Sequence, residues 1–287
     1  MVNVIWVLEN IKRHKSFYKQ FNTALLFNSV IQWRKHNKNT KTVLYCDELT
    51  YNFLNELNAL NLWHEVKKMH WIKTIDKDIF WASGKIQGIS GIEEPSVILD
   101  NDFIVYSNFE KYLGDKIIVG HDEDGKNYYP GVMEEYVKRT RNFLNRPNQK
   151  AVNCCFLYFP NAGFGRQYGL TSLDLMRKLT QIKAPSSKYL IYAEQLLLKE
   201  LIDRHSQEYE PLIGDIWHCS EKRWEKREGG IIKDKNPQLL YRHYWMEKNK
   251  ILDNEDGYSY DDEMTQLLRV IVNNTNIERT DITRLPR

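Results

Sequence analysis

The stretch "PSVILDNDFIVYSN" (residues 95–108) places two carboxylates between two apolar runs. Residues 97–99 are Val-Ile-Leu, residues 103–105 are Phe-Ile-Val, and Asp100 and Asp102 stand between them. An ionised carboxylate is costly to bury unless it is paired or coordinates a metal. The stretch therefore predicts either a turn that carries both aspartates into water or a cation bound to them.

The residues before this stretch alternate between apolar runs and segments of helical period. We expect strands at 4–8, 42–48, 64–72 and 97–99, and helices at 16–34, 49–60 and 80–92. This alternation is typical of an α/β fold with a mostly parallel central sheet flanked by helices, and ligands of such sheets bind beyond the carboxyl ends of the strands. Asp100 and Asp102 follow such an end, which favours a ligand over a solvated turn.

The second half of the chain is less regular. Its pattern predicts helices at 130–144, 170–182 and 189–205, a strand at 151–159, and a basic loop at 225–238. Neither an internal repeat nor a long linker separates this half from the first. We therefore expect a single domain over residues 1–287.

Composition excludes several classes of protein. The net charge of +3 over 287 residues is too small to indicate a nucleic-acid-binding protein by itself. The four cysteines contain no CxxC pair, which favours a reducing compartment. No stretch approaches the roughly 18 apolar residues of a membrane helix, and the N-terminus lacks the order of a signal peptide. We expect a cytoplasmic protein without a membrane span.

Asp100 and Asp102 are spaced so that both can bind one divalent cation. Oxygen ligands suit hard ions such as Mg²⁺ and Mn²⁺, which also bind substrate phosphates. An ion held there would neutralise a diphosphate and help it to leave. The competing interpretation is that the two aspartates merely begin a turn.

Four segments, in this order along the chain, resemble the nucleotide-sugar-dependent glycosyltransferases of the GT-A fold. They are residues 29–48 (helix and second strand), 80–102 (helix and Asp-x-Asp), 192–198 ("YAEQLLL") and 241–250 ("YRHYWMEKNK"). The resemblance implies one GT-A-like domain, with a nucleotide-binding half at 1–108 and an acceptor half with a C-terminal segment at 109–287. It also implies a UDP-sugar donor, bound Mn²⁺ or Mg²⁺, and an acceptor that is a glycan, a protein or a nucleic acid.

The resemblance also assigns roles to single residues. Asp102 and His243 would bind the metal. Asp100 would bind either the metal or the ribose. Lys85 would face the nucleotide, and Lys248 would stabilise the leaving diphosphate.

Further roles follow from the late helix and the first strand. Glu194 would act as acid or base or stabilise the reacting sugar, and Gln195 would hydrogen-bond that sugar. Leu8, Glu9 and Asn10, at the end of the first strand, would lie under the base and ribose.

The sequence departs from the family pattern at two places. The usual Asn-x-Gly motif appears either as residues 153–155, without the glycine, or as residues 161–163. Met246 stands where the family often has glycine, which leaves both Lys248 and Lys250 open as the lysine at the diphosphate.

Two other functions fit parts of the sequence. A phosphatase of the haloacid dehalogenase type also carries Asp-x-Asp after an apolar strand, with Asp100 as nucleophile and a paired acid available at residues 261–262. That motif normally opens the chain, which disfavours it here. A nucleic-acid-binding module could use the basic residues of 222–227 with Trp224 between them, although glutamates interrupt that run.

Overall fold

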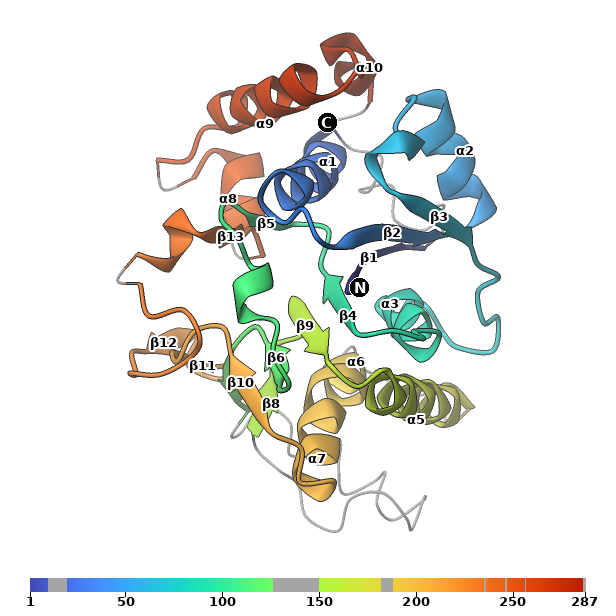
Figure 1. Cartoon of the computed structure of the whole chain (residues 1–287), viewed down its shortest axis with the longest axis vertical. Helices are drawn as coiled ribbons and strands as arrows, with labels where there is room; N and C mark the ends of the chain where they lie inside the picture. The colour runs from blue at the N-terminus through green and yellow to red at the C-terminus, as the bar shows by residue number, and fades with distance from the viewer. Residues whose placement is uncertain are drawn as a thin grey trace. The chain divides into compact units, whose positions relative to one another are not determined.

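The computed structural model describes residues 1–9, 20–125, 150–181, 188–234, 236–245, 247–255 and 257–285. It is a mixed α/β structure with a large, mostly parallel central sheet flanked by helices (Figure 1), so the predicted fold class is confirmed. The chain divides into two compact units. Unit 1 is Met1–His70, Leu99–Tyr112 and Asn236–Arg287, and unit 2 is Trp71–Ile98 and Leu113–Lys235. The single domain with two functional halves stays a prediction.

Unit 1 begins with three parallel strands and the helices that connect them. These elements are β1 (Asn3–Leu8), α1 (Gln20–His36), β2 (Lys41–Cys46), α2 (Glu48–Glu56), the 3₁₀ turn η1 (Leu60–Leu62) and β3 (Glu65–Lys68). The strands lie in the order β1-β2-β3, with Asn3 opposite Lys41. Strands β1 and β2 are mostly apolar and buried, because helices cover both faces of a parallel sheet. Strand β3, at the end of the order, carries three charged residues and is only partly buried. Every strand and helix expected over residues 1–70 is present.

The rest of unit 1 comes from two distant segments of the chain. Its elements are β5 (Phe103–Val105), η2 (Glu110–Tyr112), η4 (Pro237–Leu239), β13 (Tyr241–His243), α8 (Glu247–Asp253), α9 (Tyr260–Asn274) and α10 (Arg279–Thr283). Helix α1 contacts both segments: the Ser29 hydroxyl donates to the Phe103 carbonyl (2.6 Å), and the Asn28 side-chain amide donates to the Leu267 carbonyl (3.0 Å). Figure 1 shows α1 between α9 and the strands of this unit.

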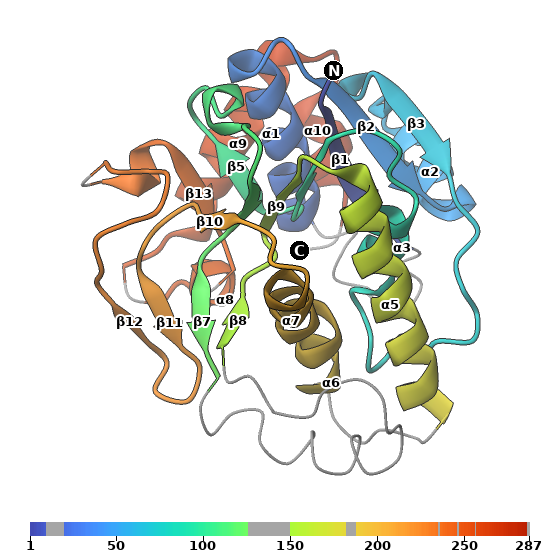
Figure 2. The ribbon, with the colours of Figure 1, turned by 60° about the horizontal axis from the view of Figure 1, so that its bottom comes forward.

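Unit 2 contains the remaining elements. They are α3 (Ser83–Ser90), β4 (Ser96–Leu99, with Leu99 counted in unit 1), β6 (Ile117–Val119), β7 (Asp122–Asp124), β8 (Lys150–Val152), β9 (Phe156–Phe159), α5 (Ala162–Gln181), α6 (Lys188–Ile191), the π-helical turn η3 (Tyr192–Leu196), α7 (Leu197–Arg204), β10 (Tyr209–Pro211), β11 (Ile216–His218) and β12 (Arg223–Glu225). Strands β7, β8, β11 and β12 form a small second sheet in the order β12-β11-β7-β8. Helices α3 and α5 pack side by side (Figure 2).

Two predictions in the second half need correction, and a third is confirmed with one irregularity. The strand expected at 151–159 is two strands, because the Asn153 side chain accepts the Cys155 amide (3.0 Å) and turns the chain between β8 and β9. The helix expected at 170–182 begins at Ala162, since its glycines pack closely against neighbours rather than breaking it. The helix expected at 189–205 is present but contains the π-turn η3. The helix expected at 130–144 lies outside the described residues.

Within the described residues, no helix combines the length and apolar character that crossing a bilayer requires.

Candidate functional site

The pairing of β5 with β13 brings the C-terminal segment to the Asp-x-Asp turn. His243 lies opposite Phe103 in this antiparallel ladder, and the Tyr244 amide donates to the Asp102 carbonyl (3.1 Å). On the other side of the turn, the Phe103 amide donates to the Asp100 carbonyl (3.1 Å). Residues that are far apart in sequence therefore meet within unit 1.

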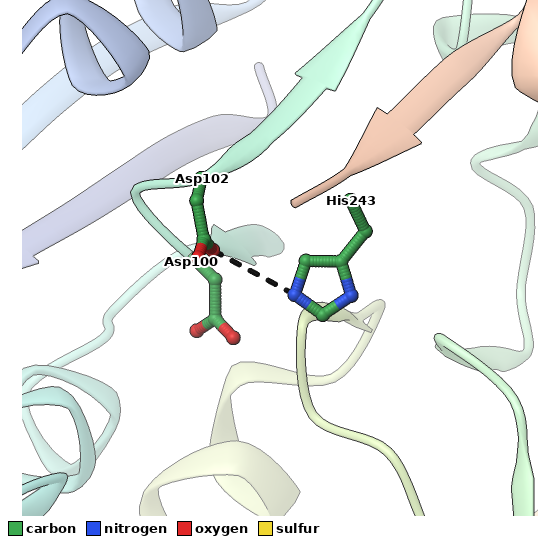
Figure 3. Close-up of side chains that lie close together, drawn as sticks. All are labelled: Asp100, Asp102 and His243. Carbon is green, nitrogen blue, oxygen red and sulfur yellow. Dashed lines mark ion pairs between the residues drawn. The ribbon is translucent and has the colours of Figure 1, made fainter. Parts of the chain in front are cut away.

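Asp100, Asp102 and His243 form a group that could hold a metal ion. One ligand atom from each lies within 4.8 Å of the others, and all three side chains are half-buried. His243 Nε2 is 3.6 Å from Asp102 Oδ1, and Figure 3 shows the imidazole directed at the carboxylates. The closeness of His243 to Asp102 that the resemblance implies is thus confirmed. That these residues bind a metal stays a prediction.

Lys248 contacts Asp102, a member of the same group. It stands in the first turn of α8, whose start is marked by the hydrogen bond from the Lys248 amide to the Tyr244 carbonyl (2.8 Å). Its Nζ is 2.6 Å from Asp102 Oδ2. Lys250, the alternative left open by the sequence, is exposed. The contact to Asp102 therefore favours Lys248.

The electrostatics of this group keep Asp102 ionised. Burial by itself raises the pKa of the Asp102 carboxyl, but the charges of His243 and Lys248 and the hydrogen bond from Lys248 outweigh it, so the pKa lies below its usual range. An ionised carboxylate is the form that binds a cation.

A network behind His243 fixes strand β13. Arg242 Nε donates to Glu247 Oε2 (2.8 Å), and Arg242 Nη1 donates to Glu263 Oε1 (2.8 Å). The buried Tyr244 hydroxyl donates to the same Glu263 oxygen (2.7 Å). The strand is thereby tied to α8 and α9. Sequence reasoning missed this network, since Arg242 and Glu263 look like ordinary surface charges when they are seen without their partners.

A second group of predicted residues lies in unit 2. Lys85, from α3, is 2.9 Å from Glu194 Oε1 and also donates to the Cys154 carbonyl (2.7 Å). Both charged side chains are largely buried, so the charge of each is balanced by the other rather than by solvent. Gln195 Oε1 is buried and has no hydrogen-bond partner among the described residues.

The π-turn η3 sets the position of Glu194. A π-turn interrupts the regular i→i−4 hydrogen bonding of a helix and is frequent at functional sites. Two side chains of α5, one turn apart, satisfy backbone carbonyls in it: the Tyr168 hydroxyl donates to the Glu194 carbonyl (2.8 Å), and the Ser172 hydroxyl donates to the Ala193 carbonyl (2.6 Å). The spacing of apolar residues in the sequence does not predict this turn.

Other candidates are placed less centrally. Leu8 is buried in β1, Glu9 is half-buried just after it, and Asn10 lies outside the described residues. Asn161 caps α5 by accepting the Gly163 amide (2.8 Å), whereas the buried Asn153 donates to Glu123 Oε1 (2.9 Å).

The basic run near β12 is largely neutralised by ion pairs. Carboxylates pair with three of its four basic side chains: Arg223 with Glu221, Lys226 with Asp215 (2.5 Å), and Arg227 with Glu225 (2.6 Å). Such pairing dilutes the field that a phosphate backbone needs, which disfavours the nucleic-acid-binding alternative.

A family of unknown function, DUF6734, matches residues 2–231. The chain belongs to this family. The part matched by DUF6734 includes Asp100, Asp102 and the Lys85–Glu194 pair, whereas His243 and Lys248 lie beyond it. No curated protein sequence matches the chain.

Several solved structures that resemble this DUF6734 chain are glycosyltransferases. GlyE of Streptococcus pneumoniae TIGR4 is 12% identical with a TM-score of 0.39, and the match covers 74% of this chain and 46% of GlyE. Mouse xyloside xylosyltransferase 1 is 12% identical with a TM-score of 0.40 and coverage of 74% and 85%. The PaToxG glycosyltransferase is 10% identical with a TM-score of 0.41 and coverage of 71% and 68%. The chain thus spans less than half of GlyE, and likenesses of this strength carry no argument about activity.

Proposed function

We propose that this chain is a metal-dependent glycosyltransferase that moves a sugar from a nucleoside-diphosphate sugar, with UDP favoured, to an acceptor. The observation that carries the proposal is the group of Asp100, Asp102 and His243. The two aspartates follow strand β4 in the chain, and Lys248 forms an ion pair with Asp102. The order of the resembling segments along the chain supports the proposal.

The residues present fit a hard divalent cation. Two carboxylates and one imidazole, with ligand atoms within 4.8 Å of one another, can lie on one octahedral ion. The imidazole nitrogen favours Mn²⁺ over Mg²⁺. When bound, such an ion supplies Lewis-acid stabilisation of negative charge on a diphosphate.

The bonds that break and form in the transfer step determine which charges the protein side chains must stabilise. The bond between the anomeric carbon and the diphosphate oxygen breaks, and its electron pair leaves with the nucleoside diphosphate. The acceptor oxygen bonds to the anomeric carbon, and its proton passes to a general base or to the departing diphosphate. Lys248, an ammonium beside the metal group, is positioned to neutralise charge on the departing diphosphate.

Glu194 and Gln195 keep their predicted roles within this proposal. Because the Lys85 ammonium lies 2.9 Å from Glu194, an ionised Glu194 suits a base or an electrostatic role better than proton donation. The unsatisfied Gln195 oxygen is an acceptor that a sugar hydroxyl would satisfy. Two further predictions are carried forward: an acceptor that is a glycan, a protein or a nucleic acid, and a cytoplasmic location.

Calorimetric titration of Mn²⁺ and UDP tests the proposal. The wild type binds UDP in Mn²⁺ and loses that binding in EDTA. Asp102→Asn and His243→Ala each weaken Mn²⁺ and UDP together by at least about tenfold, because each removes a ligand. Asp253→Asn is the matched control: it neutralises an exposed carboxylate on α8 and leaves both affinities within about twofold. Equal UDP affinity in Mn²⁺ and in EDTA contradicts the proposal.

The phosphatase alternative has its own test. A phosphate-mimicking fluoride complex that traps Asp100 covalently, in a protein with no Mn²⁺-dependent UDP binding, would establish Asp100 as a nucleophile.

A further inference from the structure

Trp245 places an exposed indole beside the candidate metal group. Its ring is stacked with the His243 imidazole, with centroids 6.3 Å apart and an angle of 15° between the planes. Trp245 is 44% exposed, whereas the other tryptophans of unit 1 (Trp6, Trp33 and Trp63) are buried. Exposed apolar surface beside a polar cluster is typical of a binding site.

Trp245 ends a row of aromatic rings that begins in the core. Tyr241 stacks on the buried Phe103, with centroids 4.9 Å apart and planes at 15°. Phe103 in turn contacts His243 at 5.8 Å, and His243 contacts Trp245. Because β5 and β13 hold the inner members of this row, the indole is presented from a rigid support, which lowers the entropic cost of binding a ligand on it.

We propose that Trp245 is the stacking platform for a pyranose ring, belonging either to the sugar of the donor or to the acceptor. This inference rests on the proposed function and names the chemistry that this part of the site recognises. A pyranose ring has one face of C–H bonds that packs on an indole, while its hydroxyls stay in contact with water. A half-exposed tryptophan offers that combination.

The covalent structure of a nucleotide sugar favours the sugar over the base. The sugar is bonded directly to the diphosphate that a metal group would hold. The base is separated from the same diphosphate by a ribose. A ring stacked on one of the candidate ligands, His243, is therefore within reach of the sugar end of the donor and of an acceptor beside it.

Calorimetry in Mn²⁺ with UDP and with UDP-glucose tests the donor as the source of the sugar ring. Trp245→Ala weakens UDP-glucose about 3- to 10-fold and leaves UDP within about twofold, since stacking on an aromatic ring contributes on that scale. Trp245→Phe restores most of the loss. Trp81→Ala, which removes an indole of similar exposure (49%) from unit 2, changes neither affinity. Equal weakening of UDP and UDP-glucose means that Trp245 stacks on the base and overturns the inference.

An array of immobilised glycans, probed in Mn²⁺ and UDP, tests the acceptor as the source. A saccharide bound by the wild type and by Trp81→Ala, but about 3- to 10-fold more weakly by Trp245→Ala, supports the inference. No Trp245-dependent change in either experiment overturns it. If the wild type binds neither UDP nor UDP-glucose, the proposed function fails, and the array alone, probed without nucleotide, decides for or against the platform.

Discussion

Cys46, the last residue of β2, has a thiol that the fold keeps protonated. Burial is the main cause, and together with the neighbouring charge of Asp47 it raises the pKa of the Cys46 thiol to about 12. In an unfolded chain a thiol loses its proton near pH 8.5. Folding therefore holds a proton that the unfolded state releases in alkaline solution.

This difference predicts a loss of stability in alkali. The contribution of Cys46 is fully present below about pH 8.5 and is lost progressively as the pH rises towards 12. Between pH 7.5 and 9.5, the unfolding free energy of the wild type should fall by about 1 kcal/mol more than that of Cys46→Ala. Urea unfolding at both pH values measures this, with Cys219→Ala, a change at a half-exposed thiol, as control. Parallel pH slopes for wild type and Cys46→Ala would refute the prediction.

At the residue scale, the sequence identified charged candidates better than the side chains that support them. Asp100 and Asp102 were proposed from a local pattern, a buried strand that ends in carboxylates, whereas His243 and Lys248 were proposed only from the resemblance of residues 241–250 to a glycosyltransferase segment. Trp245 carries no such pattern, since its exposure and its stacking on His243 depend on tertiary structure.

At the scale of elements, helix α5 shows glycine used for packing. A Cβ added at Gly169 would lie 2.6 Å from the Ser90 backbone nitrogen at the end of α3. The two helices can approach this closely because position 169 has no side chain. The helix was predicted to start at residue 170, but α5 starts at Ala162. The early turns contain three glycines, which are poor helix formers, so the local sequence gives little sign of them.

Gly169→Ala therefore destabilises the protein, although alanine is the better helix former. We expect a loss of about 1–3 kcal/mol, the usual cost of overpacking, against a gain of at most about 1 kcal/mol in helix propensity. Thermal or urea unfolding measures the change. Gly114→Ala is the control, because a Cβ there meets nothing within 4 Å. A stabilised Gly169→Ala would show that the α3–α5 contact is looser than the structure has it.

The helix at 188–204 shows a different limit of prediction from sequence. Its amphipathic pattern was recognised, and its existence is confirmed. The π-turn within it depends on hydroxyl donors from Tyr168 and Ser172, which lie 26 and 21 residues before the carbonyls that they bind. Contacts of that range leave no trace in the local period of apolar residues.

At the scale of the whole molecule, a ligand of unit 1 should stabilise the fold. A ligand that binds only the native state at about 100 times its Kd raises the unfolding free energy by about 2.7 kcal/mol, which is about 5 °C in Tm for a chain of this size. We expect this shift with Mn²⁺ and UDP together and less than about 1 °C with UDP in EDTA. Scanning fluorimetry measures it, and an undiminished shift in Asp102→Asn would place the ligand elsewhere.

The division of unit 1 into three chain segments has a consequence for biosynthesis. His243 is made 141 residues after Asp102, so at about 5–20 residues per second the nascent chain carries the aspartates for roughly 10–30 s before the imidazole exists. Strand β5 is likewise synthesised long before β13, the strand with which it pairs. Any cation that needs all three side chains therefore cannot bind early in translation, and its binding reports that the last segment of unit 1 has docked.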